Sequence, residues 1–254
     1  MSTVHLVRDG AVAELRLDNP RRLNALTGAM LDQLAAHADT IEADPAIRAV
    51  LLSAEGDRFF CAGADIREWS ALSPQDFTRH WVRRGHRVFD RIAQLPMPTL
   101  AVLTGDAMGG GLELALACDL RLAAPQVRLG LPETGVGVVP GWSGTQRLAR
   151  EVPSALLREM LLTGQALTAE RACAAGVLNR VTDTPLVAAR QLAQTIAARA
   201  PRATETAKAM LAAALGEAPA AAIEALGGAA VSGAPEMAEG VAAFTRKRPP
   251  SYED

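Results

Sequence analysis

Two glutamates stand in positions where they could perform acid–base chemistry. Glu113 lies in the first turn of a helix expected to follow the glycine triplet at 109–111, and Glu133 follows a short expected strand and Pro132. Singly, each is also typical of a carboxylate that only stabilises a helix start or lies at the surface. As a pair beside loops that could bind an oxygen atom, they indicate acid–base catalysis on a carbonyl compound.

The glycine triplet could present backbone N–H groups to a ligand. A helix that begins there has unpaired N–H groups with no side chains over them, and the helix dipole favours negative charge. A second glycine-containing loop, residues 59–66, also follows an expected strand. N–H groups from the two loops could converge on one oxygen as an oxyanion hole. Close packing of helix on sheet would equally explain the glycines, and the triplet alone does not decide between the two.

Other kinds of catalytic site find no support. The triplet does not begin a G-x-G-x-x-G dinucleotide pattern, and no G-x-x-x-x-G-K-[ST] phosphate loop occurs. The segment Gly-Trp-Ser-Gly at 141–144 is one residue too short for the nucleophile elbow of hydrolases. No histidine lies near a glycine-rich loop in the sequence, so Ser–His catalysis is not expected; the four are His5, His37, His80 and His86.

The composition is that of a globular protein with a large core. The chain has 254 residues, of which 49% are hydrophobic and 21% charged, and its formal charge is −2. These values exclude disordered, collagen-like and disulfide-scaffold proteins. The near-neutral balance predicts neither nucleic acid nor a membrane as a partner. The three widely spaced cysteines predict no metal site; they are Cys61, Cys118 and Cys173.

The N-terminus has no signal-peptide pattern, and no apolar run reaches the ~18 residues of a membrane span. We therefore expect a soluble, cytoplasmic protein.

Strands and helices alternate in the first part of the chain. A hairpin is expected around Asp9-Gly10, followed by a helix that begins at Thr27. Apolar runs predict buried strands at 48–53 and 99–104, and the spacing of apolar residues predicts one long helix between them, over about 77–95. From about residue 145 the pattern is almost entirely helical, with plausible joints at Pro201 and at 227–235. The sequence predicts an α/β core over 1–200 with parallel strand pairing and a helical region over 201–254.

Ordered motifs along nearly the whole chain resemble those of the crotonase superfamily, which contains the enoyl-CoA hydratases and isomerases. The motifs are Asn19-Pro20, Leu23-Asn24-Ala25-Leu26, Phe60-Cys61-Ala62-Gly63-Ala64-Asp65-Ile66, Gly109-Gly110-Gly111-Leu112-Glu113-Leu114-Ala115, Cys118-Asp119, Leu131-Pro132-Glu133, Pro140-Gly141, Gly144-Thr145-Gln146-Arg147-Leu148, Glu239-Gly240 and Phe244-Thr245-Arg246-Lys247-Arg248. The resemblance implies a crotonase-like α/β spiral of ββα units. It also implies a C-terminal helical region that makes subunit contacts, in trimers or dimers of trimers.

The resemblance further implies an acyl-CoA substrate. Because coenzyme A is part of that substrate, no separate cofactor is expected. The N–H groups of Ala64 and Gly110 would hold the thioester carbonyl oxygen. The remaining implied substrate contacts are Ala62, Asp65, Ile66, Gly141, Phe244 and Lys247.

Glu113 and Glu133 match both positions at which hydratases of the family carry glutamates. This implies hydration of a trans-2-enoyl-CoA in fatty acid metabolism, with Glu133 giving a proton to the α-carbon and Glu113 helping to deprotonate water. An isomerase or another crotonase-type lyase, needing mainly Glu133, is the alternative; a non-catalytic CoA- or RNA-binding relative is a third. Trp142 and Ser143 stand where the family often has small residues, so the sequence does not predict the length of the acyl chain.

Overall fold

The chain begins with the predicted hairpin, which starts a six-stranded sheet. In the structure, a computed structural model that describes residues 2–232 and 234–252, β1 (Thr3–Asp9) and β2 (Val12–Asp18) pair antiparallel. Gly10 takes a φ of +60°, which the tight turn between the two strands requires.

The later strands alternate between two sheets. The large sheet continues with the parallel strands β3 (Ala49–Ala54), β5 (Thr99–Leu103), β7 (Leu120–Ala123) and β10 (Arg180–Val181). The small sheet holds β4 (Phe59–Cys61), β6 (Asp106–Met108), β8 (Arg128–Gly130) and β9 (Leu167–Thr168), the last antiparallel. Successive strand pairs therefore place one strand in each sheet, which confirms the predicted α/β spiral with ββ pairs followed by helices.

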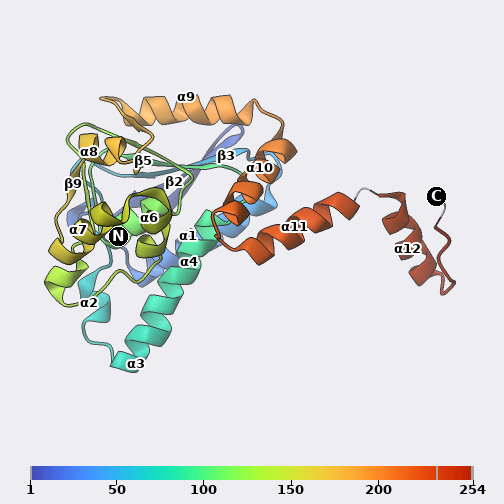
Figure 1. Ribbon diagram of the computed structural model, residues 1–254, viewed down its shortest axis with the longest axis horizontal. Helices are drawn as coiled ribbons and strands as arrows, with labels where there is room; N and C mark the ends of the chain where they lie inside the picture. The colour runs from blue at the N-terminus through green and yellow to red at the C-terminus, as the bar shows by residue number, and fades with distance from the viewer. Residues whose placement is uncertain (1, 233, 253–254) are drawn as a thin grey trace. The chain divides into compact units, whose positions relative to one another are not determined.

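The central strands β3 and β5 of the large sheet are buried on both faces, as parallel strands usually are. On one face Leu51, Leu100 and Val102 pack with small residues of α9 (Pro185–Ala197). Figure 1 shows α9, in orange, lying along this face. On the other face Val50 and Leu52 join the main core between the two sheets and the helices.

Helix α1 (Gly28–Ala43) begins where the sequence predicts. The Thr27 hydroxyl accepts a hydrogen bond from the Met30 N–H at 3.2 Å and so caps the helix. Helix α1 packs against α4 (Arg83–Ala93), which runs beside it in Figure 1.

The single long helix predicted over 77–95 is wrong. The segment forms a short α3 (Pro74–Asp76), a π-helix η2 (Phe77–Val82) and then α4. A π-turn closes its hydrogen bonds over one more residue than an α-turn, and such turns are frequent at functional sites. An apolar face recurs in either geometry, so periodicity alone did not reveal the change.

The other helices are η1 (Pro20–Arg22), α2 (Ile66–Trp69), α5 (Gly110–Leu116), η3 (Glu133–Val136), α6 (Gly144–Glu151), α7 (Ser154–Thr163), α8 (Ala169–Ala174), α10 (Pro201–Ala214), α11 (Pro219–Ser232) and α12 (Pro235–Thr245). The chain divides into two compact units after Thr204. The predicted joint at 227–235 is wrong for Gly227 and Gly228, which lie within α11 among alanines of high helix propensity.

Within the described ranges, no helix is both long and apolar enough to cross a membrane.

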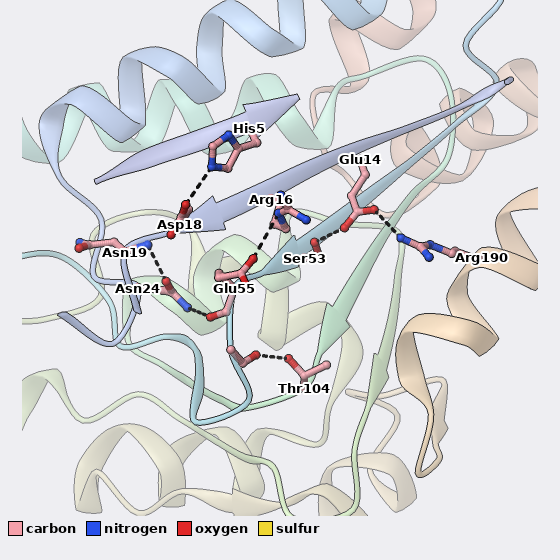
Figure 2. A network of polar contacts seen from close by, with 11 residues as sticks. His5, Glu14, Arg16, Asp18, Asn19, Asn24, Ser53, Glu55, Thr104 and Arg190 are labelled. Carbon is pink, nitrogen blue, oxygen red and sulfur yellow. Dashed lines mark hydrogen bonds and ion pairs between the residues drawn. The ribbon is translucent and has the colours of Figure 1, made fainter. Parts of the chain in front are cut away.

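A polar network ties the strands of the large sheet to the loop that leads into the small one (Figure 2). The Glu14 carboxylate on β2 accepts from the Ser53 hydroxyl on β3 at 2.6 Å and pairs with Arg190 of α9 at 3.1 Å. The buried Asn24 side chain donates to the carbonyls of Glu55 and Phe59, at 3.0 and 2.8 Å. These bonds hold the start of β4 and, with it, the loop that follows.

Candidate active site

Three loops meet at one edge of the small sheet. Strands β4, β6 and β8 are parallel neighbours, so their carboxyl ends lie at the same edge, where open α/β sheets bind ligands. The loops that follow them border a cavity of about 220 Å³. The predicted site residues that line this cavity are Ala62, Ala64, Ile66, Gly110, Glu113, Glu133 and Gly141.

The loop after β4 leaves the Ala64 N–H unpaired. Leu26 bonds to both neighbours of Ala64: its N–H donates to the Gly63 carbonyl at 2.8 Å, and its carbonyl accepts from the Asp65 N–H at 2.9 Å. In such a parallel bridge the middle residue directs its own N–H away from the partner strand. Accordingly, the Ala64 N–H donates to none of the residues that the structure describes.

Gly110 supplies a second unpaired N–H. It is the first residue of α5, and the first N–H groups of a helix have no partner within it. In the described part of the chain the Gly110 N–H has no acceptor. A Cβ built on Gly110 would lie 3.5 Å from the Ala64 nitrogen, so the two loops are in contact. Two unpaired N–H groups therefore belong to residues that line one cavity, and an oxyanion hole would require two such donors.

Glu113 is held as an acceptor. Its side chain projects from the first turn of α5, the residue is 2% exposed, and Oε1 accepts from the N–H groups of Trp142 at 2.8 Å and Gly144 at 2.9 Å. A Cβ at position 144 would lie 2.5 Å from the Glu113 Cγ, so only glycine fits there. Burial raises the pKa of Glu113 above its ordinary value, while the N–H groups of Gly144, Trp142 and Gly141 and the Arg147 charge oppose that rise.

Glu133 is held very differently. It begins η3 just after β8, and a Cβ built on Gly109 would lie 3.0 Å from its Oε1. Both carboxyl oxygens are buried and have no hydrogen-bond partner among the described residues. Burial, and after it the neighbouring Glu113 charge, raises the pKa of Glu133 to about 7. Burial therefore raises the pKa of both carboxyls, and the N–H groups bonded to Glu113 favour its charged form against that rise.

Aromatic side chains form the wall beside the acids. Trp142 is 3% exposed, and its ring lies against Phe89 and Trp81, with centroids 4.9 and 5.7 Å away. A Cβ at Gly85 would lie 2.2 Å from the indole, and one at Gly110 would lie 2.8 Å from it. The indole therefore fills a slot that two glycines leave open. The tryptophans of the chain, Trp69, Trp81 and Trp142, all line the cavity.

Asp65, Phe244 and Lys247 are the other predicted substrate contacts. Asp65 does not line the cavity; its carboxylate caps α2 at the Arg67 N–H, 3.1 Å away, and pairs with Arg22 at 2.7 Å. Phe244, 87% exposed on α12, and Lys247 belong to the unit that follows Thr204. Contact of these three residues with a substrate stays a prediction. In residues 2–232 and 234–252, no group of three His, Cys, Asp or Glu side chains is placed to hold a metal ion.

Sequence reasoning missed the groups that hold Glu113. The N–H groups of Trp142 and Gly144 lie at the start of α6, and unpaired N–H groups are general at helix starts, so the glycines at 141 and 144 carried a usable signal. It also missed His86, whose Nδ1 lies 2.8 Å from the Ser143 hydroxyl although 57 residues separate them. No histidine lies near these glycines in the sequence, but the fold brings His86 beside them.

A family model described as "Enoyl-CoA hydratase/isomerase" matches residues 8–254. A probable enoyl-CoA hydratase of Bacillus subtilis is 39% identical over 179 residues, covering 70% of this chain and 69% of that protein. A short-chain-enoyl-CoA hydratase of Clostridium acetobutylicum is 34% identical over 210 residues, covering 82% and 80%. The crystal structure of an enoyl-CoA hydratase from Bacillus anthracis superposes with a TM-score of 0.81 at 32% identity, covering 98% of each chain.

Proposed function

This chain belongs to the enoyl-CoA hydratase/isomerase family, and on that premise we propose that it adds water across the 2,3-double bond of a trans-2-enoyl-CoA. One observation carries the proposal: two unpaired N–H groups and two carboxyl groups in opposite environments border one cavity. An isomerase needs mainly one acid to move a proton between carbons, whereas hydration occupies both.

The N–H groups of Ala64 and Gly110 bind the thioester carbonyl oxygen. As water attacks the β-carbon, negative charge moves onto that oxygen. Donors that are already in place stabilise the enolate-like state without reorganising, and each is worth roughly 3–4 kcal/mol of transition-state energy. This stabilisation accounts for the contact between the loops after β4 and β6.

The two glutamates carry one proton between them. Glu113, charged, takes a proton from water as the oxygen bonds to the β-carbon; Glu133, protonated, gives its proton to the α-carbon. Water thus supplies one OH and one H to the double bond, and transfer of the proton from Glu113 back to Glu133 restores the pair. The different hydrogen bonding of the two carboxyls supports this division of roles.

The test is the assay of the purified protein with crotonyl-CoA, following loss of the ultraviolet absorbance of the conjugated enoyl thioester. Product analysis identifies the 3-hydroxyacyl-CoA that hydration requires. Conversion of a 3-enoyl-CoA without hydration would instead assign the chain to isomerisation.

The same assay should give a bell-shaped pH dependence of kcat/KM with its alkaline limb near pH 7. The active pair holds one proton, and burial with the Glu113 charge raises the pKa of Glu133 to about 7. As the pH rises through that value the pair loses its proton, so the rate should fall about tenfold per pH unit. Because hydration neither takes up nor releases a proton overall, dehydration should show the same limb. A rate that stays level for about two pH units above neutrality contradicts the assignment.

Trp142 makes short acyl groups the preferred substrates. The cavity is smaller than the ~300–1,000 Å³ of common ligand pockets, and the indole occupies its wall. The name of the relative from Clostridium acetobutylicum also points to short chains. Trp142→Ala should raise the ratio of kcat/KM for octenoyl-CoA to that for crotonyl-CoA about tenfold or more. Phe89→Leu, which alters packing behind the indole but does not line the cavity, is the control; an unchanged ratio in Trp142→Ala would remove this role.

The second unit makes the contacts of a trimer or a dimer of trimers. This unit exposes large apolar side chains, as subunit interfaces do: Met210, Leu211, Leu215, Ile223, Val231, Met237, Val241 and Phe244. The proposal also includes a cytoplasmic role in fatty acid metabolism, with no separate cofactor or metal.

A further inference from the structure

A chain of polar side chains lies behind the segment that holds Glu113. The Ser143 hydroxyl lies 2.8 Å from His86 Nδ1, and His86 Nε2 lies 3.1 Å from the Asp90 carboxylate. The other Asp90 oxygen accepts from the Arg147 guanidinium at 2.7 Å. These contacts join α4 to the start of α6.

The order of these groups is that of a hydrolase triad, but the geometry does not support a nucleophile at Ser143. The N–H after a nucleophilic serine normally belongs to the oxyanion hole. Here the Gly144 N–H donates to Glu113 instead, and Ser143 is absent from the cavity lining. The chain of contacts therefore acts on something other than an acyl group bound at the serine.

Ser143 lies between the two residues whose N–H groups hold Glu113. Its φ is +75°, a left-handed conformation that is costly for a residue with a side chain. That conformation lets the hydroxyl reach His86 on one side while the N–H groups of Trp142 and Gly144 reach Glu113 on the other. The strained turn thus links the helix α4 to the Glu113 carboxylate.

We propose that Ser143, His86 and Asp90 are positioning residues that fix the 142–144 turn and thereby hold Glu113 ready to accept a proton from water. This inference rests on the proposed hydratase function. When the Ser143–His86 bond is removed, the turn keeps the Arg147–Asp90 pair and the packing of Trp142 on Phe89 but loses its hydrogen bond to α4 at Ser143, and the N–H bonds to Glu113 weaken. Those bonds favour the charged carboxylate, so Glu113 becomes easier to protonate. The charged groups near Glu113 are Glu133 and Arg147, and removing the Ser143–His86 bond replaces neither of them.

The test compares His86→Ala and Ser143→Ala with the native protein across the pH range. We expect kcat to fall about tenfold with KM changed less than about twofold, and the acidic limb of kcat/KM to move to higher pH. Ser143→Gly removes the hydroxyl but relieves the positive φ, and it should show the same displaced limb. His80→Ala is the matched control, since His80 also pairs with an acid four residues away, Asp76, and contacts none of this chain of groups.

Two outcomes overturn the inference. In the first, His86→Ala and Ser143→Ala keep both the native kcat and the native acidic limb of kcat/KM. In the second, kcat falls but the acidic limb stays at its native pH, which would mean a merely structural role. A carbon-13 NMR titration of the Glu113 carboxyl gives the readout without turnover: its pKa should rise in both variants and stay native in His80→Ala. An inactive native protein would reject the hydratase function, and the NMR titration would still decide the positioning role.

Discussion

Replacing Glu133 by glutamine is expected to lower kcat for crotonyl-CoA hydration by about 100-fold or more, because proton transfer by a positioned acid contributes roughly 10²–10⁴-fold. Glutamine keeps the shape of the side chain but has no proton to give to the α-carbon. Glu113→Gln should cost a similar factor, since its amide cannot accept a proton from water. Both measurements use the absorbance assay at saturating substrate. Near-native turnover in both variants would end the acid–base assignment.

A loss of folding cannot imitate this result, because Glu133→Gln should be more stable than the native protein at alkaline pH. Burial raises the pKa of Glu133 from 4.5 to about 7, so the folded state binds the proton more tightly than the unfolded state. Ionising Glu133 therefore destabilises the fold progressively as the pH rises from about 4.5 to 7. Glutamine escapes that cost. Its gain in melting temperature should be full above pH 7 and absent near pH 4.

Removing the Gly110 N–H is expected to have the second large effect. Gly110 is the first residue of α5, a position that accepts proline because its N–H has no partner in the helix. Gly110→Pro should lower kcat about 10²–10³-fold, the usual cost of losing one oxyanion donor. Gly110→Ala is the control: it keeps the N–H but brings a Cβ to the same clash with Trp142, 2.8 Å away.

The comparison between these two variants decides the role of the N–H. An equal loss in Gly110→Pro and Gly110→Ala would assign the whole effect to displacement of the indole. A much larger loss in Gly110→Pro, with KM for crotonyl-CoA changed little, would assign it to the transition state, where the carbonyl oxygen carries most charge.

The elements that the sequence predicts correctly are those with local signals. Asp9-Gly10 supplies the turn of the hairpin, Thr27 caps α1, and the unbroken apolar runs form β3 and β5. In the second sheet, β8 lies at the strand expected before Pro132, but β6 within 106–108 was missed because three residues are too few to show a period of two. The π-helix was missed because its apolar face resembles that of an α-helix.

In the site, the two glutamates were predicted from residue type and place, and the structure brings both to one cavity. Their partners were not. The contact of His86 with Ser143 joins α4 to α6 across 57 residues, and the N–H groups that hold Glu113 carry no side-chain identity at all. A backbone donor is visible only when the path of the chain is known.

The π-helix at Phe77–Val82 has a consequence for how relatives of this chain diverge. Phe77, Trp81 and Val82 all line the cavity from this one wide turn. A π-turn contains one residue more than an α-turn, so loss of one residue here would restore regular winding and change which side chains this turn presents, while the helical segments on either side keep their orientation. Single insertions and deletions at this point can therefore exchange the lining of the acyl cavity in one evolutionary event, while the acids and the two N–H groups, carried on other elements, stay where they are.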